Sequence, residues 1–133
     1  MATITRFEDP DVWKLARSYY QKISPIAGQL RQQHEFRFAE QIKSAAGSIM
    51  DNIAEGFSRN SRLEFLQSLS IAKGECGESR SQVYRLFDDN YITEETYSEL
   101  LKDSGHLSGK IANFVKYLNS TAIKGLKYKD RKQ

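Results

Sequence analysis

Histidine spacing gives the first test for catalytic chemistry in this sequence. Di-iron proteins built from helical bundles use Glu-x-x-His pairs. Here Arg31 stands three positions before His34, and Asp103 stands three positions before His106. We therefore expect both histidines to lie at the surface and not to form a metal centre. The sequence also contains no HExxH motif and no P-loop, so we expect no cofactor.

Two short motifs in the middle of the chain resemble a catalytic site and a nucleic-acid-binding loop. We predict neither function for them. Ser70-Ile-Ala-Lys73 matches the Ser-x-x-Lys pattern of serine acyl-enzymes, but the Ser-Asp-Asn and Lys-Thr-Gly elements are missing. Gly74-Glu-Cys-Gly77 has the spacing of a GXXG nucleic-acid loop, yet Glu75 and Glu78 flank it. We expect the two glycines to mark close packing of another helix. No convergent set of ionisable groups remains, which predicts a protein without enzymatic activity.

A polar stripe at helical spacing is harder to dismiss. Its members are Gln41, Ser44, Ser48, Asn52, Glu55 and Arg59. A plain solvated face would more typically use lysine and glutamate, whereas serine and asparagine suit a contact where helix backbones approach. The stripe therefore predicts either a polar seam within the chain or an interface between subunits.

Four amphipathic helices, and no strand, are predicted to position these residues. We expect them to begin near Asp9, Glu35, Ser61 and Thr93 and to end near Leu30, Phe57, Asp88 and Ile123. The starts carry capping residues, including a Ser-x-x-Glu capping box at Ser61. Pro25 predicts a kink or break near Ser24. Gly56 is expected to end the second helix in a left-handed conformation.

Short connections between helices of this length require each helix to run antiparallel to its sequence neighbours. The predicted fold is therefore all-α, an antiparallel up-down-up-down four-helix bundle. Each helix has a core stripe; that of the second is Phe38, Ile42, Ala45, Ile49 and Ile53. The single cysteine, Cys76, lies on the core stripe of the third helix and is expected to be a small, inert core residue.

The apolar residues of the first helix exceed what one core stripe needs. Trp13 and Tyr20 lie off the stripe, and Ile26 and Leu30 extend the surplus. Aromatic residues of this kind are typical anchors of subunit contacts. The surplus therefore predicts a homo-oligomer.

Positive charge is concentrated at the C-terminal end of the sequence. The 133 residues carry a net charge of +3, yet the last ten include Lys124, Lys127, Lys129, Arg131 and Lys132 against one aspartate. We divide the chain into a bundle domain, 1–123, and a basic tail, 124–133. The tail predicts either a solvated end or an electrostatic arm for phosphate backbones. Arg59 and Arg62, with Lys73 and Arg80 near the polar stripe, are the further candidates for nucleic-acid binding.

Neither membrane insertion nor export is predicted. No apolar run approaches the roughly 20 residues of a membrane span, and the first ten residues lack the apolar core of a signal peptide. We therefore expect a cytoplasmic protein with no membrane partner.

The stretch from Gln41 to Gly56, followed by Arg59 and Ser61–Leu66, resembles the signature of the 23S ribosomal RNA intervening-sequence protein family. Six motif positions carry the resemblance: Gln41, Ser48, Asn52, Glu55, Gly56 and Arg59. The opening with Phe7, Val12, Trp13 and Ala16 is also similar. Two details depart from the family pattern. Gln33-His34-Glu35 lacks a proline, and the residue after Glu78 differs.

The resemblance implies a four-helix bundle without established enzymatic activity. It also implies self-assembly, with a homopentamer as the specific expectation, and a partner that is RNA or DNA. An alternative is a protein-interaction scaffold with no nucleic-acid role. Phosphate contacts produce a steep salt dependence of binding, so a salt series with labelled RNA separates the two.

Overall fold

The computed structural model describes residues 10–120 and contains four helices there, without a strand. They are α1 (Asp11–Gln32), α2 (Phe36–Ser58), α3 (Arg62–Asp88) and α4 (Glu94–Ser120). The all-α prediction is confirmed, and the last three helices begin within one residue of the predicted positions. Asp9, the predicted end at Ile123, the boundary at 123/124 and the basic tail lie outside the described residues.

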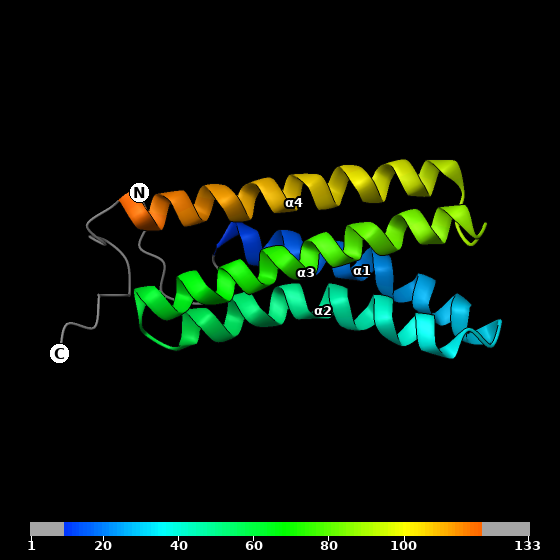
Figure 1. Cartoon of the computed structure of the whole chain (residues 1–133), viewed down its shortest axis with the longest axis horizontal. Coiled ribbons are helices and arrows are strands. Elements are labelled where there is room, and N and C mark those ends of the chain that lie inside the picture. Colours follow the sequence, from blue (N-terminus) through cyan, green and yellow to red (C-terminus); the bar gives the residue numbers. More distant parts are fainter. Residues whose placement is uncertain (1–9, 121–133) are drawn as a thin grey trace.

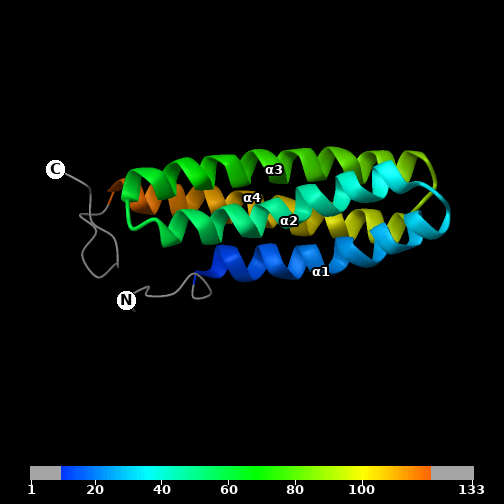
Figure 2. The same ribbon diagram turned by 90° about the horizontal axis from the view of Figure 1, so that it is seen from below.

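The helices form a four-helix bundle in which successive connections alternate between the two ends (Figures 1 and 2). α2 packs against α1 and α3, and α4 closes the bundle by packing against α3 and α1. α3 therefore lies diagonally opposite α1 and has α2 on one side and α4 on the other. None of the described helices is both long enough and apolar enough to cross a bilayer.

Side-chain caps begin two of the helices as predicted. The Ser61 hydroxyl accepts a hydrogen bond from the Glu64 amide at 3.3 Å, and the Thr93 hydroxyl accepts one from the Thr96 amide at 3.1 Å. Each bond satisfies one of the amides that a helix start leaves unpaired. At α1 the capping position is occupied by Pro10, which makes no side-chain cap.

Pro25 does not break α1, which continues without interruption to Gln32. The proline lies on the exposed face of the helix, so water can bond the carbonyl that loses its amide partner. Figure 2 shows α1 inclined differently over its second half, consistent with the predicted kink. Because the helix stays in phase, Ile26 and Leu30 are buried in the core. The prediction that these two residues add surplus apolar surface to the first helix was therefore wrong.

Helix ends are formed by residues other than glycine. His34, Asn60 and Asn90 have φ of 64°, 57° and 64°, one in each connection. After α1, the Glu35 amide donates to the Leu30 carbonyl at 2.8 Å, the six-to-one bond that closes a Schellman motif. Asparagine visits the left-handed region more readily than most residues, which suits it to these positions.

Gly56 was predicted to end α2, and that prediction was wrong. The helix continues to Ser58, and Gly56 is buried where α2 meets α3. A Cβ at this position would overlap the Ser68 side chain and lie 3.2 Å from Cδ1 of Phe65. The glycine therefore permits close approach of the two helices.

Gly74 and Gly77 differ from Gly56, because no helix of the described chain approaches them. Both are exposed on α3, and an added Cβ would meet nothing within 4 Å at either position. No helix of the described chain packs on them, so the close packing predicted from the sequence is not present.

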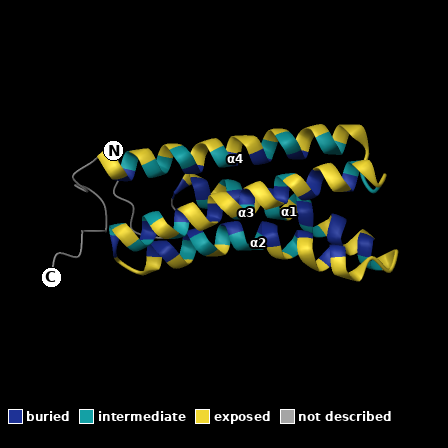
Figure 3. Ribbon diagram, in the orientation of Figure 1, coloured by how far each residue is buried: buried dark blue, intermediate teal, exposed yellow. Residues whose placement is uncertain are grey.

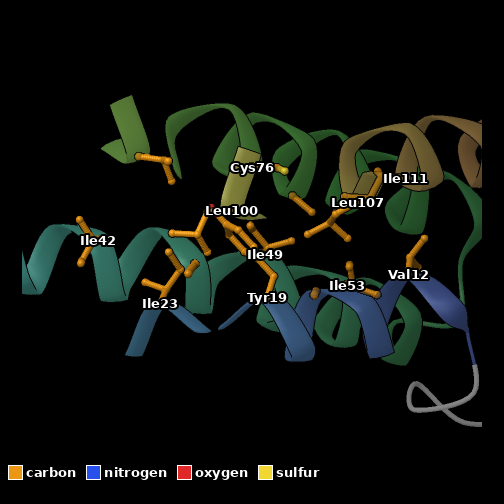
Figure 4. Close-up of a cluster of buried hydrophobic side chains, with 14 of the residues drawn as sticks. Val12, Tyr19, Ile23, Ile42, Ile49, Ile53, Cys76, Leu100, Leu107 and Ile111 are labelled. Atoms are coloured by element: carbon orange, nitrogen blue, oxygen red, sulfur yellow. The ribbon is translucent and has the colours of Figure 1, made fainter. Parts of the chain in front are cut away.

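The core runs the length of the bundle and contains Phe38, Ile42, Ile49 and Ile53 of the predicted α2 stripe, and Ala45 is buried as well. Figure 3 shows the buried residues on the inner sides of the helices. Side chains from all four helices converge in Figure 4, where Tyr19 enters among Ile49 and Leu100. Tyr19 and Cys76 are each 1% exposed or less, so the prediction of Cys76 as a core residue is confirmed.

Candidate nucleic-acid interface

The turn between α2 and α3 lies beside the end of α4. Nη1 of Arg62 donates to the Asn119 side-chain oxygen at 3.4 Å, joining the start of α3 to the last turn of α4. Figure 1 shows both segments at the same end of the bundle. The described part of α4 stops at Ser120, immediately before the sequence that carries the basic tail. We call this end of the bundle the basic end.

Arg59 is engaged by acidic side chains of its own chain. Its guanidinium donates to Glu55 at 2.8 Å, within α2, and to Glu64 of α3 at 3.5 Å. The carboxylate of Glu55, more than that of Glu64, raises the pKa of Arg59. Two carboxylates against one guanidinium leave this cluster net negative, so Arg59 is a poorer phosphate ligand than the sequence predicts.

A groove of about 330 Å³ opens between α4 and the start of α1 at the basic end. It is lined by Pro10, Asp11, Val12, Lys110, Asn113, Phe114 and Tyr117. The Phe114 and Tyr117 rings are nearly parallel, at 17° with centroids 6.2 Å apart. Spacing alone places Phe114 on the core stripe and leaves Tyr117 off it. The groove was therefore missed, because it exists only where α1 and α4 meet.

Two arginines of α3 contact α4, whereas Arg85 lies over Phe38 of α2. Arg62 contacts Asn119, and Nη1 of Arg80 donates to the Leu101 carbonyl at 2.8 Å and to the Ser104 hydroxyl at 3.0 Å. The expectation that Arg62 and Arg80 border the polar stripe was wrong. The five tail residues Lys124, Lys127, Lys129, Arg131 and Lys132 lie outside the described residues.

The polar stripe does not form a side-chain seam across the bundle. Asn52 donates to the Ser48 carbonyl at 2.8 Å within α2, while Gln41 and Ser44 are exposed. Gln41 is joined to α3 through its backbone, since its carbonyl accepts from the Gln82 side chain at 3.3 Å. The stripe therefore lies at the surface beside α3, and its role as a subunit interface stays a prediction.

A buried polar cluster joins three helices inside the bundle. The hydroxyls of Tyr19 and Ser79 are 2.7 Å apart, which links α1 to the diagonal helix α3. Ser104 of α4 is fully buried; its hydroxyl accepts from Arg80 and its carbonyl accepts from the Cys76 thiol at 3.4 Å. Burial raises the pKa of Tyr19 to about 12. Buried polar groups bonded in this way fix which faces of the helices meet.

An ion pair holds α1 against α4 at the surface. Nζ of Lys22 donates to Glu99 at 2.7 Å and to Asp103 at 2.5 Å. The hydrogen bond with Asp103, followed by that with Glu99, raises the pKa of Lys22. Within residues 10–120 no group of three His, Cys, Asp or Glu side chains is placed to hold a metal ion.

These features define an all-helical bundle with a buried polar cluster that joins three of its helices. The sequence profile of the 23S rRNA-intervening sequence protein family matches residues 8–113. The chain belongs to this family.

One solved structure similar to this chain is the 1.70 Å crystal structure of a protein of unknown function from the S23 ribosomal protein family of Bacteroides thetaiotaomicron. The two chains share 28% sequence identity with a TM-score of 0.74, over 79% of this chain and 95% of the other. No curated protein matches the chain.

Proposed function

We propose that this chain is a non-enzymatic, self-assembling bundle that binds RNA at its basic end. The observation that carries the proposal is the contact between Arg62 and Asn119. It brings the α2–α3 turn beside the end of α4, from which five basic tail residues follow in the sequence. Clustered cations attract phosphates and release condensed counterions on binding.

The aromatic groove at the same end adds a second kind of contact. Tyr117 lies less than one helical turn from Asn119, and Lys110 also lines the groove. Aromatic side chains beside a basic surface bind exposed bases by stacking, with little dependence on sequence. The proposed ligand is therefore single-stranded or unpaired RNA in the cytoplasm.

Self-assembly would multiply this interface. Several weak basic ends held together bind a polymer more tightly than one, because each further contact is intramolecular. We propose a homopentamer, and the number five rests on the family resemblance alone.

A protein-interaction scaffold is the second candidate. Residues 10–120 contain equal numbers of acidic and basic side chains, and Arg59 is already paired with carboxylates. A dedicated nucleic-acid binder usually shows a basic face on the folded domain. If the scaffold is correct, the basic tail only aids solubility.

Binding of a labelled single-stranded RNA across a salt series tests the proposal. We expect removal of residues 124–133 to weaken binding and to reduce the slope of log K against log salt by about 3, since the tail carries five cations and one anion. Tyr117→Ala should weaken binding with an unchanged slope, because stacking releases few ions.

Lys14 lies at an exposed position of α1, so Lys14→Ala is the matched control. This variant should bind RNA as the wild type does. Equal affinity and slope with and without the tail would contradict the proposal and favour the scaffold.

A further inference from the structure

The outer face of α3 exposes apolar side chains, and one of them, Tyr84, packs its ring against Tyr97 of α4 at 5.7 Å between centroids. Four large apolar side chains are exposed in residues 10–120, and three of them belong to α3: Leu63, Ile71 and Tyr84, at 60%, 47% and 46%. Gly74 and Gly77 lie between them with open space at the Cβ position. A surface helix usually presents polar side chains outward, and exposed apolar side chains beside bare backbone are typical of contact surfaces.

The α2 side of this face carries two neighbouring carboxylates, and Arg85 lies over Phe38 of α2 farther along α3. The Gln82 amide nitrogen donates to Glu78 at 3.4 Å and to the Gln41 carbonyl at 3.3 Å, which places Glu78 on the α2 side of α3. Glu75 lies next to Glu78, where burial and the neighbouring carboxylate raise the pKa of Glu75. We call Glu75 and Glu78 the acidic flank.

The other side is basic. Arg80 contacts α4, and Lys73 lies two helical turns before it, on the same side of α3. On α4, Gly105 faces Arg80, since its Cβ would lie 2.9 Å from Nη1 of that residue. Lys102 and Lys116 are exposed on the same line of α4, three residues before and eleven after Gly105. We call Lys73, Lys102 and Lys116 the basic flank.

We propose that α3 mediates contact between copies of this chain, with the acidic flank of one copy against the basic flank of the next. This inference rests on the self-assembly in the proposed function. Opposite charges across a contact favour correct pairing. Two acidic flanks, or two basic flanks, in contact would instead place like charges together. Contact between unlike flanks is heterologous, so it repeats from copy to copy and forms a ring where the rotation between copies closes. Gly74 and Gly77 let the backbones approach at this contact.

Charge reversal tests the pairing. One variant carries Glu75→Lys and Glu78→Lys, and a second carries Lys73→Glu and Lys102→Glu. Masses are measured by native mass spectrometry and analytical ultracentrifugation. We expect the wild-type chain to assemble and each variant alone to be monomeric. An equimolar mixture of the two should associate again, because one then has two basic flanks and the other has two acidic flanks.

Lys14→Glu with Lys110→Glu, at exposed positions of α1 and α4 away from α3, is the matched control for charge and should assemble normally. Circular dichroism of each variant checks that the helices are retained; a variant that loses them is replaced by Glu78→Gln or Lys102→Gln, which should weaken assembly without abolishing it. A monomeric wild type would overturn the proposal, as would variants that still assemble alone or a mixture that stays monomeric. RNA binding that depends on Lys73 and Lys102 in a monomeric chain would assign the basic flank to RNA instead. Since the readout is mass, loss of the proposed RNA binding alone leaves this result unaffected.

Discussion

Tyr19 is a buried polar residue whose single hydroxyl links two diagonal helices. Ser79 is 1% exposed, and Tyr19→Phe removes the tyrosine hydroxyl that bonds its side chain. We expect the free energy of unfolding in urea to fall by about 1–3 kcal/mol, and Ser79→Ala to cost a similar amount. The double variant should cost less than the sum of the two, because both halves of the bond are then removed. Additive losses would show that the two hydroxyls do not interact.

The same residue makes stability depend on pH in the alkaline range. The pKa of Tyr19 is raised from 10.0 to about 12, mainly by burial, so the folded protein keeps this proton where the unfolded chain has lost it. The contribution is present in full below pH 10 and is lost as pH rises from 10 towards 12, by about 1.4 kcal/mol per unit. Urea unfolding at pH 9, 10 and 11 should show a steeper decline for wild type than for Tyr19→Phe. Parallel declines would refute the assignment.

At the scale of elements, two glycines in helices have opposite roles. Gly56→Ala should lower the free energy of unfolding by about 1–3 kcal/mol, since the new methyl group overlaps Ser68 where α2 and α3 meet. Gly28→Ala, exposed on α1 with nothing near its Cβ, should raise it by about 1 kcal/mol. Thermal unfolding of the two variants compares them directly. A stabilised Gly56→Ala chain would mean that the helices can separate at no cost.

Helix positions were predictable because local signals determine them. Ser61 and Thr93 cap helices through bonds within four residues, and the stripe of α2 repeats at the helical period. The role of Gly56 was not predictable, because a glycine near a helix end looks the same whether it ends the helix or admits a neighbour. Ile26 and Leu30 were misassigned because the effect of Pro25 depends on which face of the helix it occupies.

The candidate site was less predictable than the fold. Arg59 and Arg62 are three residues apart in one turn, yet Arg59 bonds Glu55 and Glu64 while Arg62 bonds Asn119. The Arg59–Glu55 pair has the i,i+4 spacing of a helix, whereas the Arg62–Asn119 contact depends on the packing of α4, which spacing along one helix does not contain. The groove beside Tyr117 needs α1 and α4 together for the same reason.

At the scale of the whole molecule, charge is arranged across α3 as well as along the chain. The acidic flank lies on the α2 side of α3 and the basic flank on its α4 side, with Lys102 and Lys116 contributed by α4. Salt should therefore weaken both RNA binding and contact between copies, because both depend on solvent-exposed charges. The mass measurements and the RNA titrations are best compared at the same ionic strength.

Closure of the bundle by α1 and α4 has a consequence for chain connectivity. Pro10 and Tyr117 line the same groove, so the start of the first helix and the last turns of the fourth are neighbours in space. A short linker joining these two positions would span little distance, and the chain could then be cut open at the exposed Asp89–Asn90 turn instead. Such a circular permutant would keep every helix pairing of the bundle, which is a property of folds whose ends meet. The order in which the helices are synthesised is therefore separable from the architecture that they build.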